Sequence, residues 1–169
     1  MEDTLRSRAA RVRLVAFDVD GVLTDGRITY TSAGDEIKSF NVQDGAAIKM
    51  LLDAHIQVAI ITGRASPMVT RRARELGIVH VFQGVHDKAA TFSALRTRLS
   101  LEVEECAHVG DDLPDLVLFA EVGLAISVPN AHPAVQAAAH WVTATAGGDG
   151  VAREVCQALL VARSQWPWK

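Results

Sequence analysis

Short apolar segments alternate along the chain with longer segments in which hydrophobic residues recur at helical spacing. The apolar segments cover residues 13–18, 57–62, 80–83, 106–109 and 124–126, and the helical segments cover residues 45–55, 67–76, 88–99, 113–120, 134–139 and 151–163. Strands without polar alternation are typical of a parallel sheet that helices cover on both faces. The pattern therefore predicts an α/β fold with a doubly wound parallel sheet.

Residues 21–44 interrupt this alternation directly after the first predicted strand. Two β-favouring stretches, 27–31 and 36–40, flank Ser32-Ala-Gly-Asp35, which predicts a β-hairpin with a glycine-containing turn. An insertion of this length is more typical of a lid than of core packing. Residues 147–169 form a glycine-rich turn, a last helix and a tail, and no linker divides the chain. We expect one domain over residues 1–169.

Composition and charge narrow the class of function. The chain carries 17 Lys and Arg against 20 Asp and Glu, a formal net charge of -3, so no broad basic face for nucleic acid or anionic lipid is predicted. No apolar run reaches the roughly 18 residues of a membrane span. Cys106 and Cys156 belong to no Cys-x-x-Cys motif, and we expect free thiols in a reducing cytoplasm. A small-molecule substrate is favoured.

Polar residues gather where the predicted strands end. They are Asp18 and Asp20 after the first strand, Thr62 to Arg64 after the second, Lys88 at the helix after the third, and Gly110 to Asp112 after the fourth. Ligands of open parallel sheets bind at the edge where the strands end. Carboxylates that converge there need a neutralising cation, and hard oxygen ligands favour Mg²⁺. With a hydroxyl and an ammonium beside the metal, the set suits phosphoryl transfer.

Four motifs in this order resemble those of the haloacid dehalogenase superfamily of aspartate-nucleophile phosphatases. They are Asp18-Val-Asp20-Gly-Val-Leu-Thr24, Ile60-Ile-Thr-Gly-Arg64, Lys88 and Val109-Gly-Asp-Asp-Leu-Pro-Asp115. The resemblance implies that Asp18 is the nucleophile, that Asp20 is the general acid and base, and that Thr62 and Lys88 bind the phosphoryl group. It also implies a magnesium ion held by the Asp18 carboxylate, the Asp20 main-chain carbonyl and Asp111. Asp112 is expected outside the ligands, and Asp115 is expected to position Lys88 or a metal-bound water.

Further features look like those of the 3-deoxy-D-manno-octulosonate 8-phosphate phosphatase family. They are the small size, the hairpin where other members carry a cap domain, Phe40-Asn-Val-Gln-Asp-Gly45, Gly84 with Asp87-Lys88, Asn130-Ala-His-Pro133 and Gly147-Gly-Asp-Gly-Val-Ala-Arg-Glu154. The similarity extends from about residue 13 to residue 162. It implies a capless, Mg²⁺-dependent phosphatase of lipopolysaccharide sugar biosynthesis that works as a homotetramer. Four hairpins would then form a barrel, and each subunit would screen its neighbour's active site.

Substrate contacts are expected from Thr24, Asn41, Asp44, Gly45, Gly63, Arg64, Arg72 and Arg153. For Asn41 and Asp44 the alternative is capping of the helix that starts near Gly45, and for Arg153 it is a surface charge. His132, before Pro133, is expected to be a turn residue without a catalytic role. The other histidines, including those at positions 55, 80, 108 and 140, lack metal-ligand spacing with one another, and we expect them to be structural.

Two alternatives to this substrate and activity remain. The family usually has Arg where this chain has Gln43, which leaves a related sugar phosphate such as a nonulosonate 9-phosphate as an alternative substrate, although Arg64 fits the octulosonate branch. A phospho-accepting receiver domain also combines acidic residues, Thr and Lys on a doubly wound sheet. A receiver carries its phospho-acceptor Asp at the third strand, however, and no Asp ends the third strand here.

Overall fold

A six-stranded parallel sheet forms the centre of the computed structural model, which describes residues 3–168. The ends of the predicted domain, residues 1, 2 and 169, lie outside the described residues. The strand order is β5-β4-β1-β6-β7-β8. The strands are β1 (Leu14–Phe17), β4 (Gln57–Ile61), β5 (His80–Phe82), β6 (Cys106–Gly110), β7 (Leu124–Ser127) and β8 (Trp141–Val142). From β1, the chain builds β4 and β5 on one side and β6 to β8 on the other, which confirms the predicted doubly wound sheet.

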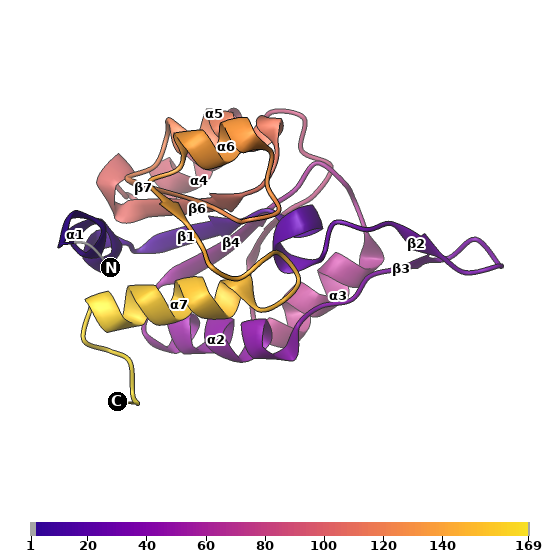
Figure 1. Ribbon diagram of the computed structural model, residues 1–169, viewed down its shortest axis with the longest axis horizontal. Helices are drawn as coiled ribbons and strands as arrows, with labels where there is room; N and C mark the ends of the chain where they lie inside the picture. The colour runs from indigo at the N-terminus through magenta and orange to yellow at the C-terminus, as the bar shows by residue number, and fades with distance from the viewer. Residues whose placement is uncertain (1–2, 169) are drawn as a thin grey trace.

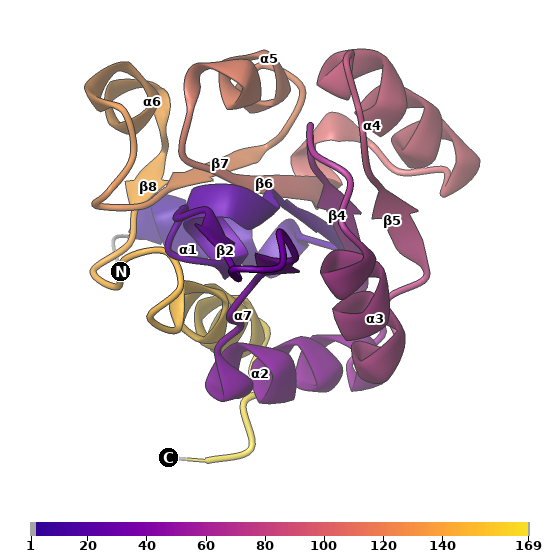
Figure 2. The ribbon, with the colours of Figure 1, turned by 90° about the vertical axis from the view of Figure 1, so that its right-hand side faces the viewer.

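Helices cover both faces of the sheet. Figure 2 shows α2, α3 and α7 below it and α4, α5 and α6 above it. The helices are α1 (Asp3–Arg11), α2 (Val42–Asp53), α3 (Pro67–Leu76), α4 (Lys88–Arg98), α5 (Leu116–Phe119), α6 (Pro133–Ala138) and α7 (Val151–Ala162), with short turns η1 (Val19–Leu23), η2 (Val103–Glu105) and η3 (Leu113–Asp115). Because both faces are covered, β1, β6 and β7 are buried along their whole lengths. Each large apolar side chain buried in this way stabilises the fold by about 1.5–3 kcal/mol.

Local sequence signals explain several of the helix ends. Pro67 and Pro133 lie in the first turns of α3 and α6, where a backbone amide hydrogen would have no acceptor within the helix. Asp87 accepts a hydrogen bond from the Ala90 amide at 2.9 Å and so caps α4 at Lys88. Gly77 ends α3 with a φ of 80°. Among residues 3–168, no helix has both the length and the apolar character that a bilayer crossing requires.

Besides the short turns η1 and η2, the sequence patterns did not predict α1 and β8. Helix α1 buries only Ala9 and so lacks the broad apolar stripe by which a helix is recognised in a sequence. Strand β8 has only two residues at the edge of the sheet, too few for a recognisable pattern. The segment predicted as one helix over residues 113–120 is divided into η3 and α5.

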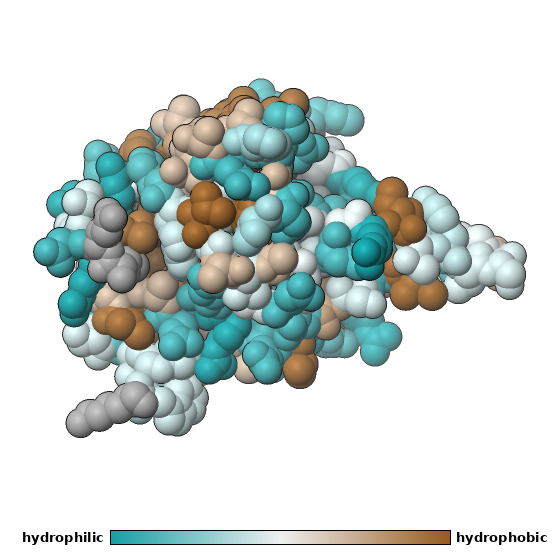
Figure 3. Space-filling view, in the orientation of Figure 1, coloured by the Kyte–Doolittle hydropathy of each residue, from teal (hydrophilic) through white to brown (hydrophobic). Residues whose placement is uncertain are grey.

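The predicted hairpin is present and projects from the body of the molecule (Figure 1). Strands β2 (Thr29–Tyr30) and β3 (Glu36–Ile37) pair antiparallel, so the paired region is shorter than the two predicted stretches. Ile28, Tyr30 and Ile37 are all exposed on it. Figure 3 shows hydrophobic side chains on this projecting part of the surface. A two-stranded hairpin with exposed apolar side chains is marginally stable alone.

Candidate active site

A cavity of about 760 Å³ lies where β1, β4 and β6 end. This edge is the switch point of the sheet, where loops from neighbouring strands turn in opposite directions and leave room for a ligand. The cavity brings together the predicted residues Asp18, Asp20, Thr62, Gly63, Arg64, Lys88, Asp111, Asp112 and Asp115. It is also lined by Val85 and His86, which the sequence patterns did not single out.

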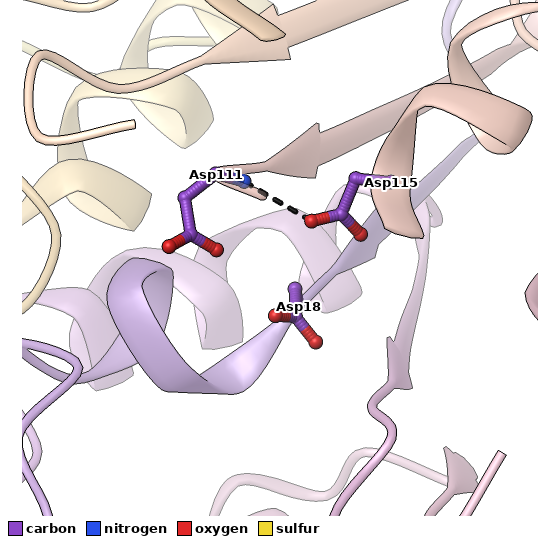
Figure 4. Close-up of side chains that lie close together, drawn as sticks. All are labelled: Asp18, Asp111 and Asp115. Carbon is purple, nitrogen blue, oxygen red and sulfur yellow. Dashed lines mark hydrogen bonds between the residues drawn. The ribbon is translucent and has the colours of Figure 1, made fainter. Parts of the chain in front are cut away.

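Three of the carboxylates that line the cavity lie close together (Figure 4). Asp18 follows β1, Asp111 follows β6, and Asp115 ends η3, and each offers an oxygen within 4.8 Å of the others. Lys88, at the first position of α4, places its Nζ 3.1 Å from Asp18 Oδ1 and 2.7 Å from Asp115 Oδ1. The cluster therefore combines three potential anions with one buried ammonium.

Asp115 already has partners for both carboxylate oxygens. Its Oδ1 accepts hydrogen bonds from Lys88 Nζ at 2.7 Å and from His108 Nε2 at 2.9 Å. Its Oδ2 accepts the backbone amides of Asp111 at 3.1 Å and Asp112 at 3.2 Å. Asp115 is thus suited to orient the Asp111 loop and to position Lys88, which is the first of the two roles expected for it, rather than to coordinate an ion.

Asp18 and Asp111, in contrast, present unsatisfied oxygens. Within residues 3–168, Asp18 Oδ1 and Asp111 Oδ1 are buried without a hydrogen-bond partner, although Lys88 lies at ion-pair distance from the first. Buried carboxylate oxygens without a partner are costly unless a cation or proton satisfies them. Oxygen ligands of this kind suit a hard divalent ion such as Mg²⁺. The residues present therefore fit the metal that the sequence motifs imply.

The carboxyl groups of the cluster differ in acidity. Burial raises the pKa of Asp18, and the neighbouring Asp115 raises it further against the opposing charge of Lys88. Burial and the charge of Asp18 also raise the pKa of Asp111, to about 7. Burial would raise the pKa of Asp115 too, but hydrogen bonds and charges from His108 and Lys88 hold it well below its ordinary value. Without a divalent ion, the negative charge of the cluster is therefore best accommodated on Asp115.

These shifts predict a pH-dependent stabilisation by magnesium. Without the ion, Asp111 keeps a proton in the folded state that the unfolded chain, with an ordinary pKa of 3.8, has already released. The metal-free protein should therefore lose stability as the pH rises from about 4 to about 7. Magnesium replaces that proton, so the increase in Tm on adding it should be larger at about pH 8 than at about pH 5.

Thermal unfolding in chelator and in magnesium chloride, at matched ionic strength, measures this effect. Asp44 acts in the same direction, because burial raises its pKa to about 6, but it lies outside the cluster. The Asp111→Asn variant is therefore the control, since it should lose the magnesium response while Asp44 still titrates. An equal Tm increase at both pH values in the unsubstituted protein would contradict the prediction.

The loop after Asp18 depends on Gly21. This residue has a φ of 91°, and an added Cβ would collide with the Asp111 carboxylate. The Gly21 carbonyl accepts a hydrogen bond from Asn130 Nδ2 at 2.9 Å, and Asn130 Oδ1 in turn accepts the Gly147 amide at 2.7 Å. Gly148 donates its amide to the Val22 carbonyl at 2.9 Å. The predicted glycine-rich turn before α7 thus packs directly on the loop that carries Asp20.

The hairpin also reaches the cavity, through residues that the sequence analysis missed. The ammonium of Lys38, almost fully buried, contacts the Asp20 carboxylate and lies 3.7 Å from Glu36 Oε1. Glu36 Oε1 lies 2.5 Å from Arg64 Nη2, and Arg64 Nε lies 3.9 Å from Asp20 Oδ2. Glu36 and Lys38 are two residues apart on an extended segment and so share one face, which is the signal that could have identified them.

Six of the predicted substrate-binding residues do not line this cavity. They are Thr24, Asn41, Asp44, Gly45, Arg72 and Arg153. Thr24 is buried and donates its hydroxyl to the Val19 carbonyl at 3.3 Å. Arg72 donates to the Asn41 carbonyl at 3.2 Å and lies against Gly45, where an added Cβ would meet its guanidinium.

Asn41 and Asp44 each accept a backbone amide in the first turn of a helix. Asn41 caps α2 by accepting the Gln43 amide at 2.8 Å, so the helix begins at Val42, three residues before the predicted start. Asp44 is buried and accepts the Arg153 amide at 2.8 Å, which joins the first turns of α2 and α7. The Arg153 guanidinium lies 4.8 Å from the centre of the Trp166 ring, so the tail residue Trp166 is docked on α7.

Sequence comparisons show which proteins this chain is similar to. A haloacid dehalogenase-like hydrolase family matches residues 75–155. The chain is 44% identical over 163 residues to 3-deoxy-D-manno-octulosonate 8-phosphate phosphatase of Yersinia pestis, covering 96% of this chain and 87% of that protein. It is 45% identical over 159 residues to the phosphatase of the same name from Escherichia coli K12, covering 94% of this chain and 85% of that protein.

Structural comparisons agree. The crystal structure of the Yersinia pestis phosphatase superposes with a TM-score of 0.96 at 43% identity, covering 98% of this chain and 90% of that one. The Moraxella catarrhalis phosphatase, solved with magnesium, phosphate and KDO (3-deoxy-D-manno-octulosonate), gives a TM-score of 0.95 at 44% identity, covering 98% of this chain and 95% of that one. The resemblance inferred from the motifs is confirmed. The chain belongs to the 3-deoxy-D-manno-octulosonate 8-phosphate phosphatase family of haloacid dehalogenase-like hydrolases.

Proposed function

We propose that this chain hydrolyses 3-deoxy-D-manno-octulosonate 8-phosphate to the free sugar acid and phosphate, as a magnesium-dependent step of lipopolysaccharide sugar biosynthesis. The observation that carries the proposal is the pair of unsatisfied carboxylates, Asp18 and Asp111, beside the buried ammonium of Lys88. The Moraxella catarrhalis relative, of nearly the same fold, holds magnesium, phosphate and KDO. A cation and a phosphoryl group are the two partners that such a cluster lacks.

The chemistry follows from the proposed roles of the residues. The Asp18 carboxylate attacks phosphorus, the ester P–O bond breaks, and an aspartyl-phosphate forms on Asp18. Lys88 and Thr62 hold the phosphoryl oxygens, and Lys88 offsets their charge from a position 3.1 Å from Asp18. A magnesium ion bound by the Asp18 carboxylate, the Asp20 main-chain carbonyl and Asp111 would neutralise further phosphoryl charge.

Asp20 handles the protons in both steps. It gives a proton to the departing sugar alkoxide, then takes one from the water that attacks the aspartyl-phosphate, which releases phosphate and regenerates Asp18. In the structure, Asp20 lines the cavity, and Lys38 and Arg64 lie at ion-pair distance from its carboxylate.

A substrate panel tests the proposal. Phosphate release from KDO 8-phosphate, a nonulosonate 9-phosphate and glucose 6-phosphate should give a kcat/KM at least about tenfold higher for KDO 8-phosphate, a discrimination of about 1.4 kcal/mol. Chelator should abolish release and magnesium restore it. A preference for the nonulosonate compound would favour the alternative substrate that Gln43 leaves open. Stable phosphorylation without turnover would instead favour the receiver domain.

We also propose that the protein assembles as a homotetramer through its hairpins, with each active site at a subunit interface. The exposed Ile28, Tyr30 and Ile37 support this, because a partner surface would bury side chains that the single chain leaves in water. The two strands also have unpaired edges, which closure of four hairpins into a barrel would remove. Arg153 and the tail would then contribute to a neighbour's site rather than to their own.

Polar substitution of the hairpin should therefore dissociate the assembly. The double variant Tyr30→Ser, Ile37→Ser should shift the mass measured by sedimentation equilibrium from tetramer toward monomer, and kcat/KM should fall by about tenfold or more as the cavity loses its cover. Val79→Ser is the control, because Val79 is also an exposed apolar residue but lies between α3 and β5, away from the hairpin. A double variant of unchanged mass would contradict the proposed interface.

The cytoplasm is the proposed location. Cys106 and Cys156 are free and buried, which is usual for a protein in a reducing compartment. We also propose that the chain forms one domain, with residues 21–44 as an insertion in it and the segment from residue 147 onward as its C-terminal turn, helix and tail.

A further inference from the structure

We propose that His108 is a positioning residue for the phosphatase reaction, acting through Asp115 on Lys88. The inference rests on the proposed function, because Lys88 is taken to bind the phosphoryl group. His108 lies on β6 and is fully buried, and no sequence motif assigns it a role. Its side chain nevertheless reaches the carboxylate that holds Lys88.

The position of the imidazole ring is fixed on both sides. Nδ1 lies 3.1 Å from the Ala16 carbonyl oxygen on β1, two residues before Asp18. Nε2 lies 2.9 Å from Asp115 Oδ1. The ring of Phe119 packs edge-on with its centre 6.0 Å away. His108 thus connects the strand that carries the nucleophile to the turn that carries Asp115.

Both ring nitrogens face atoms that accept hydrogen bonds. A backbone carbonyl has no proton to give, and an ionised carboxylate has none either. His108 is therefore the donor in its contact with Asp115 Oδ1. Asp115 is the acceptor for all of these partners, because its two oxygens accept from Lys88, His108 and the amides of Asp111 and Asp112.

The contact between His108 and Asp115 limits where Lys88 can lie. Asp115 Oδ1 is shared between His108 and Lys88, while Oδ2 stays on the two amides. Lys88 Nζ also lies 3.1 Å from Asp18 Oδ1, so it is divided between the two carboxylates. Without His108, Oδ1 of Asp115 would have Lys88 as its one remaining donor among these groups. The ammonium would then be drawn toward Asp115 and away from the phosphoryl site.

Two substitutions test this arrangement. His108→Phe keeps an aromatic ring in the core and removes the donor to Asp115, whereas His108→Gln restores a donor that can reach Asp115. With p-nitrophenyl phosphate as substrate, His108→Phe should raise the inhibition constant of inorganic phosphate and the KM by about tenfold, the scale expected when a supporting partner is lost. His108→Gln should recover part of the phosphate affinity.

Cys106→Ala is the matched control for core damage. Cys106 is buried on the same strand, and its sulfur contacts the Glu102 carbonyl rather than the cluster. This variant should lower Tm and leave the inhibition constant of phosphate unchanged. If His108→Phe lowers Tm as Cys106→Ala does and also leaves phosphate affinity unchanged, His108 is a core residue only and the proposal is overturned.

A spectroscopic measurement on the unsubstituted protein does not depend on the variants folding. The chain has six histidines, and ¹⁵N-histidine labelling with the His108→Gln spectrum, or backbone assignment, identifies the ring of His108. Its Nε2 should carry a proton that is hydrogen-bonded to Asp115, with and without magnesium. An unprotonated Nε2 would overturn the proposal. If the unsubstituted protein hydrolyses no phosphate ester, the proposed function fails while this measurement still decides whether His108 donates to Asp115.

Discussion

The Asp18→Asn variant should lose phosphatase activity by roughly 10⁴-fold or more, the scale observed when a covalent nucleophile is removed. An amide cannot attack phosphorus, and it also removes a charged ligand from the cation site. The fold should survive, because the substitution keeps the size of the side chain and removes a buried carboxylate whose pKa is already raised by burial. Steady-state phosphate release and thermal unfolding measure the two effects separately.

Asp53→Asn is the control for this experiment. Asp53 is exposed at the end of α2 and does not line the cavity, so the same chemical change there should leave kcat and KM unaltered. Activity of Asp18→Asn within about tenfold of the unsubstituted protein would remove Asp18 from the role of nucleophile.

Gly21→Ala should produce the second large loss. The new methyl group would overlap the Asp111 carboxylate, so either Asp111 moves away from Asp18 or the loop with Asp20 shifts. The change should also cost about 1–2 kcal/mol of stability, because an L-residue disfavours the φ of 91° at this position. Displacement of a reacting group by about 1 Å can reduce the rate by about 10²-fold. We therefore expect about a 10²-fold fall in kcat/KM together with weaker magnesium binding.

Gly34→Ala separates the two causes. Gly34 has a φ of 90° at the tip of the hairpin, and an added Cβ there meets no atom within 4 Å. It reproduces the backbone strain of Gly21→Ala without the collision. Calorimetry with magnesium should show weakened binding for Gly21→Ala alone. Equal losses of magnesium affinity in the two variants would show that strain, rather than contact with Asp111, is responsible.

Much of the fold and the centre of the site could be predicted from the sequence, because both depend on local patterns. Buried strands of a parallel sheet are continuously apolar, and their ends share one edge by topology alone. Asp18, Thr62, Lys88 and Asp111 follow directly from these strand ends, and the structure brings them to one cavity. Helix α2 begins three residues before its predicted start at residue 45, because its N-cap is Asn41 rather than Asp44.

The remaining features depend on contacts between segments far apart in the chain. The pairing of Lys38 with Asp20 requires knowing how the chain returning from the hairpin packs beside the loop after Asp18. Arg72 and Asp44 were predicted near the substrate, but their partners are the Asn41 carbonyl and the Arg153 amide. His108 stands within a buried strand, where a polar side chain must find a partner. Such a residue can be recognised in a sequence, but its partner cannot be identified there.

The contact between the glycine-rich turn and the Gly21 loop affects how deletion experiments are read. A chain shortened after Ala146 would lose the tail that we propose reaches a neighbouring subunit. It would also lose the Gly147 and Gly148 amides, which hydrogen-bond to Asn130 and to Val22 and so support the loop after Asp18. A fall in turnover after that deletion would therefore have two causes. A stop codon after Arg163 keeps α7 and the hydrogen bonds of Gly147 and Gly148. It removes Trp166 with its stacking on Arg153, so it isolates what the tail itself contributes.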